Sequence, residues 1–326
     1  MNYNTYIIAE IGINHEGNFT LCKEMVHAAK KAGVNAVKLQ TIDAEKCYAK
    51  DTESYKIFSK ANLTKKETEK IFNYAKSLKL DIFTTVGDIQ TANWIKKLKP
   101  SAWKISASLI THVPLLEHLA TFQEPIFLST GLSTNKEINE AVIMLKKNKK
   151  RNFYLLHCVS KYPTPFQEAH LSRIDYLKKN FNVKIGYSDH TLGTLACCIA
   201  VSKGACIIEK HFTKNNKRKG YDHKISLDYK EMKNLVDSIR STELMLNKKN
   251  KFQDTIKKNR KKFLRVLVAN RRINKGEKFN EINISAKRVN NNNSSLPPVH
   301  YKKLIGKSSQ KNYEEGQLIM PVELKK

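Results

Sequence analysis

The sequence predicts an α/β protein made of a (β/α)8 barrel followed by a small second domain. Short apolar runs alternate with longer amphipathic segments up to about residue 210, a pattern typical of repeated βα units around a parallel sheet. The chain has 326 residues, whereas a single core rarely grows beyond roughly 250 to 300 residues. We therefore expect one large domain and one small one.

Eight apolar runs have the length of β-strands. They lie at 7–11, 36–40, 81–85, 102–106, 126–130, 153–158, 184–188 and 206–210. Segments with apolar residues at the helical period separate them, for example 21–31, 65–79, 89–98, 136–147 and 194–203. Eight βα cycles in about 210 residues predict that the strands close into a TIM barrel, which occupies residues 1–248.

The remainder of the chain has a different composition. A helix is expected at 228–247, and the lysine-rich stretch 249–262, which is poor in apolar residues, is predicted to link the two domains. Residues 263–326 contain short apolar runs broken by turn-forming tracts such as 274–277 and 314–316. We expect a small, turn-rich domain there, with a loop at the asparagine-rich tract 290–295.

The chain is strongly basic. Its 59 Lys and Arg residues outnumber 30 Asp and Glu residues, and the formal net charge of +29 would suit a nucleic acid or an anionic substrate. The lysines are scattered along helix-like segments and do not gather around aromatic residues. We therefore expect a solvated basic surface and no nucleic-acid partner. The alternative is a nucleic-acid-binding protein on an inactive barrel, which salt-sensitive binding to random oligonucleotides without turnover would favour.

Several features indicate a cytoplasmic protein. The first residues lack a basic segment followed by a long apolar run, so no signal peptide is expected. The most apolar later stretch, 192–208, is interrupted by Lys203 and falls short of the roughly 20 apolar residues that cross a membrane. The six cysteines include no Cys-x-x-Cys pair and are expected to be reduced thiols.

Polar side chains stand where the apolar runs stop, and barrel enzymes place their active sites at that end of their strands. Side chains alternate between the two faces of a strand, so polar residues two positions apart can point into the barrel mouth together. Three such pairs occur: Lys38 with Gln40, Ser188 with His190, and Glu209 with His211. The other polar candidates are Glu10, Thr85, Lys104, Tyr162 and Asp222.

These residue types indicate an anionic substrate beside a metal ion. His190 and His211 are the best metal candidates, because two imidazoles from adjacent strands suit a divalent first-row ion such as Mn²⁺ or Zn²⁺. Lysine ammonium groups provide positive charge for a phosphate or carboxylate, and carboxylates can transfer protons or position water. The lysines are Lys38 and Lys104, and the carboxylates are Glu10, Glu209 and Asp222.

Two motifs of the sequence are highly specific, GYSDHT at 186–191 and IEKHFT at 208–213. They occur with IAEIGINHEG at 8–17, VKLQ at 37–40, WKI at 103–105, LSTG at 128–131, HC at 157–158 and YPTP at 162–165. The order of these motifs along nearly the whole chain resembles the sialic acid synthase family, which includes N-acetylneuraminate synthases and the related legionaminic and pseudaminic acid synthases. The resemblance implies a barrel joined to an antifreeze-protein-like (SAF) domain that begins near Phe263.

The resemblance also implies a role for each candidate residue. It assigns a divalent metal, usually Mn²⁺, to His190 and His211, and it places Glu10 and Glu209 near the reacting carbons. Phosphoenolpyruvate would be held by Lys38, Thr85, Lys104 and Ser188. The open-chain sugar would be held by Gln40, Tyr162 and Asp222. The family forms domain-swapped homodimers, and Arg288 matches the arginine that reaches the partner's sugar site.

The implied activity is that of a transferase in carbohydrate biosynthesis. It would condense phosphoenolpyruvate with N-acetylmannosamine or a related N-acylated hexose to give a nonulosonic acid and phosphate. The alternatives are a legionaminic or pseudaminic acid synthase, or another phosphoenolpyruvate aldol synthase of the 3-deoxy-octulosonate phosphate type. The chain departs from the family pattern at Ala107, Ser160 and Val86-Gly87.

Overall fold

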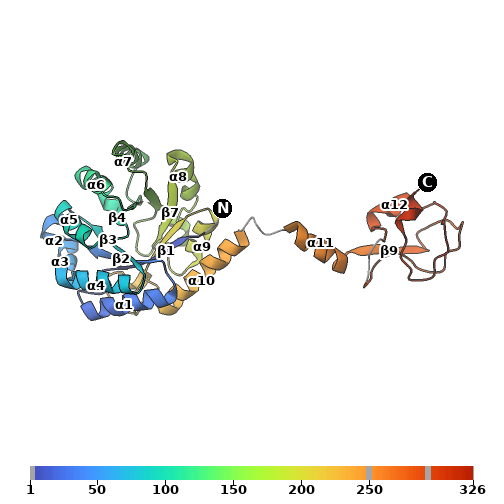
Figure 1. Cartoon of the computed structure of the whole chain (residues 1–326), viewed down its shortest axis with the longest axis horizontal. Helices are drawn as coiled ribbons and strands as arrows, with labels where there is room; N and C mark the ends of the chain where they lie inside the picture. Colours follow the sequence, from blue (N-terminus) through green and yellow to red (C-terminus); the bar gives the residue numbers. More distant parts are fainter. Residues whose placement is uncertain (1–3, 247–251, 291–294, 326) are drawn as a thin grey trace. The chain divides into compact units, whose positions relative to one another are not determined.

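The computed structural model describes residues 4–246, 252–290 and 295–325, and these fall into two compact units, Met1–Asn247 and Lys248–Lys326 (Figure 1). Each unit has its own hydrophobic core. Among the described residues, no helix is both long enough and apolar enough to cross a membrane.

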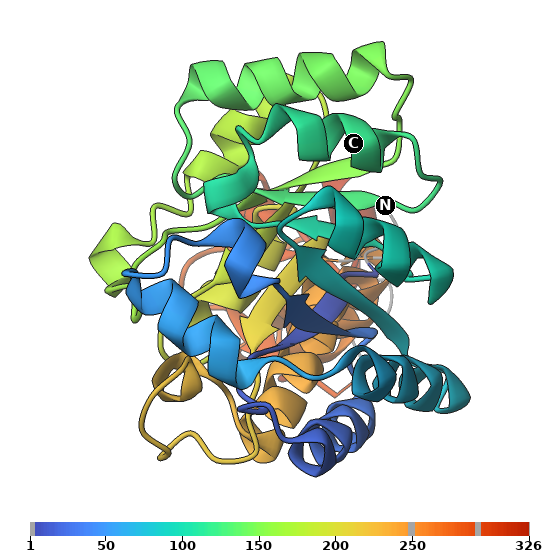
Figure 2. The same ribbon diagram turned by 90° about the vertical axis from the view of Figure 1, so that its left-hand side faces the viewer.

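The first unit is the predicted barrel. Eight parallel strands close on themselves in sequence order, from β1 to β8, with helices packed around them (Figure 2). The strands are β1 (Tyr6–Gly12), β2 (Ala36–Thr41), β3 (Asp81–Val86), β4 (Trp103–Ile105), β5 (Ile126–Ser129), β6 (Phe153–His157), β7 (Lys184–Asp189) and β8 (Ile207–His211).

Local sequence signals account for the ends of several helices. Thr64 and Thr134 begin α4 and α7, each in a capping box with the glutamate three residues later. Gly33 ends α1 in a left-handed conformation with φ of 89°. The α-helices of this unit are α1 (Phe19–Ala32), α2 (Ala44–Cys47), α3 (Glu53–Ala61), α4 (Lys65–Ser77), α5 (Ile89–Lys97), α6 (Val113–Ala120), α7 (Asn135–Lys147), α8 (Arg173–Phe181), α9 (Leu195–Ser202) and α10 (Tyr229–Leu246).

The centre of the barrel is filled by a layer of apolar side chains. They come from seven of the strands or their immediate flanks: Ile8, Ala36, Phe83, Ala102, Phe127, Leu156 and Ile207. The layer is tightly packed, with the rings of Phe83 and Phe127 meeting edge to face at 5.4 Å. Neighbouring strand residues such as Ile7 and Ala9 instead join the core beneath the helices. Because of this alternation, apolar side chains fill the barrel interior, and polar side chains follow them at the carboxyl ends of the strands.

The remaining strand, β7, contributes Gly186 at the level of this layer. A Cβ atom added at Gly186 would lie 2.5 Å from Leu156 Cδ2 and 2.8 Å from Ile207 Cβ. Those distances are far below van der Waals contact, so β6 and β8 leave no room for a side chain on β7. The close approach of the three strands therefore requires glycine at this position.

The second unit is small and has few regular elements. It contains α11 (Phe252–Phe263), an antiparallel pair of β9 (Arg265–Ala269) with β10 (Ile284–Arg288), the short helix α12 (Tyr301–Leu304), and the 3₁₀ turns η4 (Pro298–His300) and η5 (Pro321–Leu324). Helix α11 covers most of the stretch 249–262 that the sequence predicts to be a linker. Within the predicted loop 290–295, residues 291–294 lie outside the described part of the chain.

A fully buried ion pair supports the end of β7. Lys210 Nζ donates to Asp189 Oδ2 over 2.8 Å, and both side chains are 0% exposed. Lys210 also donates to the carbonyl oxygen of Thr191. Asp189 in addition accepts hydrogen bonds from the Thr191 amide at 2.8 Å and the Tyr187 hydroxyl at 2.9 Å. These contacts fix the backbone on both sides of His190.

Replacing Lys210 by methionine should destabilise the barrel by about 3 kcal/mol, because Asp189 would remain buried without its counter-charge. The matched control is Lys203→Met. Lys203 pairs with Asp175 at 2.6 Å, but those side chains are 33% and 56% exposed, so the loss should stay under about 1 kcal/mol. Urea unfolding followed by tryptophan fluorescence measures both. Equal small losses would contradict a structural role for the buried pair.

Candidate active site

The barrel mouth, at the carboxyl ends of the strands, is lined by polar side chains that lie next to the apolar layer. Each of seven polar or thiol side chains lies two positions after a residue of that layer and so shares its face of the strand. They are Glu10, Lys38, Thr85, Lys104, Ser129, Cys158 and Glu209, and all seven are buried. Ser188 follows Gly186 in the same way on β7. The fold thus gathers the residues that the sequence predicts at the strand ends.

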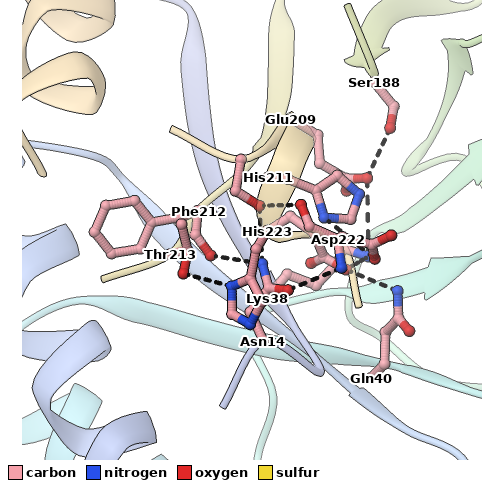
Figure 3. Close-up of polar contacts among 12 residues, drawn as sticks. Asn14, Lys38, Gln40, Ser188, Glu209, His211, Phe212, Thr213, Asp222 and His223 are labelled. Atoms are coloured by element: carbon pink, nitrogen blue, oxygen red, sulfur yellow. Dashed lines mark hydrogen bonds and ion pairs between the residues drawn. The ribbon is translucent and has the colours of Figure 1, made fainter. Parts of the chain in front are cut away.

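Two lysines and two glutamates form a buried charged cluster at the mouth. Lys38 and Glu209 of this cluster are labelled in Figure 3. Lys38 Nζ lies 2.9 Å from Glu10 Oε1 and 3.8 Å from Glu209 Oε1. Lys104 Nζ donates to the same Glu209 oxygen over 2.6 Å. Two positive and two negative groups balance, which allows the cluster to exist away from water.

Neutral hydrogen-bonding groups surround this cluster (Figure 3). Ser188 Oγ donates to Glu209 Oε1 over 2.9 Å, and Gln40 Nε2 donates to Glu10 Oε1 over 3.0 Å. Lys38 Nζ donates to Thr85 Oγ1 over 3.2 Å. Every one of these side chains was expected at the mouth from the sequence, and contacts join them into a single network.

The two carboxylates of the cluster differ in their affinity for protons. Burial raises the pKa of Glu10 to about 7, despite the attraction of Lys38. Burial alone would also raise the pKa of Glu209, but Lys104 and Lys38 outweigh it and hold that pKa at about 2. Near neutral pH, Glu10 can therefore gain or lose a proton while Glu209 stays ionised.

The lysines also differ. Burial alone would lower the pKa of Lys38, but the two nearby carboxylates outweigh burial and raise it. For Lys104, burial prevails over the attraction of Glu209 and lowers the pKa. Lys38 is therefore the more firmly protonated of the two ammonium groups.

Three buried polar atoms at the mouth have no hydrogen-bond partner within the described parts of the chain: Glu10 Oε2, Glu209 Oε2 and His211 Nδ1. Most buried polar atoms in folded proteins are hydrogen-bonded, because an unpaired one costs about 1 to 3 kcal/mol. Their concentration in one place indicates that a ligand completes their bonding.

His190 and His211 lie side by side at the ends of β7 and β8, with ring centroids 5.5 Å apart. His190 Nδ1 is 2.6 Å from the carbonyl oxygen of Val159, which can only accept, so this nitrogen carries the proton. Burial lowers the pKa of His190 to about 4 and the pKa of His211 well below its ordinary value. Both imidazoles are therefore neutral at physiological pH, as metal ligands must be.

The residues present fit a divalent metal with open coordination positions. His190 has Nε2 available as a lone-pair donor, and its Nδ1 bond to a backbone carbonyl is the kind of contact that orients metal-binding histidines. Nowhere in the described residues do three or more His, Cys, Asp or Glu side chains group as a complete metal site. Two imidazoles fill only part of the coordination shell of a divalent first-row ion, so a metal held by them would keep positions for substrate or water.

A cavity of about 450 Å³ adjoins the histidines. Tyr162 lines it and stacks on the His190 ring at 4.1 Å, while Asp222 lines it with Oδ2 3.6 Å from His211 Nδ1. Burial raises the pKa of Asp222 to about 6. The rest of the lining comes from the loop after β8 and includes the cationic side chains Lys217, Arg218, Lys219 and Lys224.

Arg288 does not lie in the barrel unit. It is exposed on β10 of the second unit, where its guanidinium sits 5.3 Å from the ring centre of Phe263. The sequence-predicted role of this residue at a partner's site stays a prediction.

Some groups at the site were not found from the sequence. The Val159 carbonyl that orients His190 is a backbone group, and the residue type at position 159 does not predict this contact. Asp189 and Lys210 lie between predicted site residues in the sequence, but their side chains face the outside of the barrel, where they pair with each other. The alternation of side chains along a strand could have predicted that they face away from the mouth. Asn14 belongs to a recognised motif, yet its contacts with the loop after β8 depend on the tertiary fold.

The sequence is similar to known proteins over most of its length. The model of the NeuB family matches residues 25–251, and the SAF domain matches residues 265–325. An uncharacterized protein of Methanocaldococcus jannaschii is 41% identical, over 87% of this chain and 85% of its own length. The N,N'-diacetyllegionaminic acid synthase of Campylobacter jejuni is 35% identical, over 97% of this chain and 98% of its own length.

A solved structure agrees with these matches. The N-acetylneuraminic acid (sialic acid) synthetase of Leptospira borgpetersenii, crystallised with citrate, has a TM-score of 0.74 and 33% identity. The likeness covers 79% of this chain and 92% of the Leptospira chain. The resemblance seen in the sequence and the predicted two-part fold are thereby confirmed.

The raised pKa of Glu10 predicts a pH-dependent stability. Its stabilising contribution should be fully present below the unfolded-state pKa of 4.5 and lost as the pH rises through about 7. The free energy of unfolding of the wild type, minus that of Glu10→Gln, should therefore fall between pH 4.5 and 7 and level off above.

Both tryptophans, Trp94 and Trp103, lie in the barrel unit, so fluorescence-detected urea unfolding at several pH values reports the relevant domain. Glu140→Gln, at an exposed position, is the control. A difference that stays constant across the window for Glu10→Gln would show that the carboxyl titrates outside it.

Proposed function

This chain belongs to the NeuB family, and we propose that it is a synthase that condenses phosphoenolpyruvate with an N-acylated hexose to give a nonulosonic acid and phosphate. The observation that carries the proposal is the arrangement of the mouth. Buried lysines for an anion and a proton-exchanging glutamate share one contact network, and two neutral imidazoles lie at the ends of the adjacent strands β7 and β8. These are the groups that joining an anionic enol to an aldehyde requires.

Phosphoenolpyruvate would lie against Lys38 and Lys104, with Thr85 and Ser188 as neutral donors. The lysines are held by Glu10 and Glu209 before the substrate arrives, so little reorganisation is needed when an anion binds.

The glutamates would divide the work of proton transfer and charge stabilisation. Carbon–carbon bond formation uses the enol carbon as nucleophile and leaves positive charge at the neighbouring carbon, to which water adds before phosphate departs. Glu209 remains ionised and can stabilise that positive charge. Glu10 can accept the proton that the attacking water releases.

His190 and His211 would hold the divalent metal, for which we propose Mn²⁺. The metal would act as a Lewis acid on the sugar carbonyl. The two side chains contribute neutral donors on adjacent strands, and the Val159 carbonyl fixes the orientation of His190.

The sugar would occupy the cavity beside the histidines, which Tyr162 and Asp222 line. It would also contact Gln40, which donates to Glu10 at the mouth. We propose N-acetylmannosamine or a related N-acylated hexose, such as the diacetamido sugars that lead to legionaminic or pseudaminic acid. Cationic side chains line one wall of the same cavity, so phosphorylated hexoses belong among the candidates to be tested. We place the enzyme in the cytoplasm.

The proposed function predicts phosphate release from phosphoenolpyruvate in the presence of Mn²⁺ and one N-acylated hexose. A coupled phosphate assay should compare N-acetylmannosamine, its 6-phosphate, the two diacetamido-trideoxyhexoses and a pentose phosphate. Turnover only with the pentose phosphate would favour a 3-deoxy-octulosonate phosphate type of synthase. Silence with every acceptor would contradict the proposal.

The same assay tests the metal ligands. His190→Ala should abolish turnover while leaving the unfolding midpoint of the barrel nearly unchanged, because it removes a ligand and not a side chain of the apolar layer. His27→Ala is the control, since His27 is exposed on α1, outside the mouth, and its ring hydrogen-bonds to the Tyr74 hydroxyl. Manganese-dependent turnover retained by His190→Ala would refute this assignment.

We further propose that the protein acts as a domain-swapped homodimer in which Arg288 completes the sugar site of the partner subunit. If so, inactive Arg288→Ala and inactive His190→Ala subunits should regain partial activity when refolded together, because a mixed dimer contains one intact site. Activity of the mixture no greater than that of either parent would count against the swapped arrangement.

A further inference from the structure

Two loops meet beside the mouth of the barrel, one after β1 and one after β8, and Asn14 joins them (Figure 3). Its side chain is 1% exposed. Nδ2 donates to Ser226 Oγ over 2.8 Å and to the carbonyl oxygen of Phe212 over 3.0 Å. Oδ1 accepts from the backbone amide of Asp222 over 3.1 Å. All these contacts go to the loop that carries Asp222.

The other backbone group of Asp222 is held through the same side chain. Ser226 Oγ donates to the carbonyl oxygen of Asp222 over 2.7 Å, and Asn14 Nδ2 donates to that hydroxyl oxygen. Because the serine hydroxyl accepts from Asn14, its single proton is directed to the Asp222 carbonyl. The Asp222 carbonyl also accepts from the Ile225 amide over 3.2 Å. The Asp222 amide is therefore held by Asn14 directly, and one of the two bonds to the Asp222 carbonyl is held by Asn14 through Ser226.

The backbone that precedes Asp222 is strained. Tyr221 has φ of 46° and follows Gly220 with φ of 83°. The left-handed region costs a non-glycine residue roughly 1 to 2 kcal/mol, and such conformations persist only where the surroundings enforce them. A hydrogen bond to the amide of the next residue is one such constraint.

A separate contact joins the same two loops without Asn14. His223 Nε2 lies 2.9 Å from Glu16 Oε1, and His223 Nδ1 lies 2.8 Å from Thr213 Oγ1. His223 is 0% exposed. The loops should therefore stay together when Asn14 is replaced, so that the effect of its loss is confined to Asp222.

We propose that Asn14 is a positioning residue that fixes the Asp222 carboxylate beside His211 at the sugar end of the mouth. The carboxylate lies 3.6 Å from His211 Nδ1 and lines the cavity assigned to the acceptor sugar. The inference rests on the proposed function for its kinetic consequence. The structural part of the inference, that Asn14 fixes the Asp222 backbone, does not depend on the proposed function.

The kinetic test compares Asn14→Ala, Ser226→Ala and Asp222→Ala with the wild type. Asn14→Ala should raise the KM for the hexose by roughly tenfold and leave the KM for phosphoenolpyruvate unchanged, because a misplaced Asp222 weakens only sugar binding. Ser226→Ala should change it in the same direction by less. Asn35→Ala is the matched control, since Asn35 Oδ1 accepts from the Ile7 amide over 2.8 Å where β1 begins, away from the mouth.

A double-mutant cycle separates positioning from general destabilisation. If Asn14 acts through Asp222, adding Asn14→Ala to Asp222→Ala should produce no further change in the hexose KM. Additive effects of the two substitutions, or a rise in both Michaelis constants together, would overturn the proposal.

Hydrogen–deuterium exchange gives an answer that does not require activity. In Asn14→Ala, a peptide that covers residues 220–224 should exchange faster, because the Asp222 amide loses its hydrogen-bond partner, while strands β1 to β8 keep their protection. Unchanged exchange in that peptide would refute the hold on Asp222. Faster exchange together with absent turnover of the wild type would support that hold and count against the proposed function alone.

Discussion

The alternation of side chains along the barrel strands is the constraint on which the site depends. Residues such as Ile8, Phe83 and Ile207 fill the interior, and the residue two positions later on each strand meets its counterparts at the mouth. A shift of one position in any strand would exchange Glu10 for Ala9 or Glu209 for Ile208. Close packing of the layer, including the contact that excludes a side chain at Gly186, prevents such a shift.

The same constraint makes a charged site possible inside a folded domain. Lys38, Lys104, Glu10 and Glu209 are each 3% exposed or less, and none would be tolerated there alone. Their mutual contacts balance the charges but leave Glu10 and Glu209 each with one unpaired oxygen. Part of the hydrogen-bonding capacity of the site is therefore held open for a ligand at some cost to stability.

The periodicity of the sequence was sufficient to predict the strands and the side chains that share the barrel mouth. Apolar runs predicted the strands, and the spacing of pairs such as Ser188 with His190 predicted which side chains share the mouth. It was insufficient where a backbone atom or a distant loop decides the outcome. The Val159 carbonyl orients His190, and Asn14 reaches Asp222 across 208 residues of sequence. Such contacts depend on how loops from opposite ends of the chain close the barrel.

The groups of the site are mounted on two kinds of support. The residues proposed to bind phosphoenolpyruvate stand on barrel strands, where neighbours on both sides fix them. Two of the three residues proposed to bind the sugar, Tyr162 and Asp222, stand on loops beyond the strands, and the third, Gln40, stands on β2. Loops accept substitutions and insertions more readily than packed strands. Substitutions in these loops can therefore change the sugar that binds while the phosphoenolpyruvate site stays the same. A laboratory search for new acceptor sugars should randomise the loops and leave the strand residues unchanged.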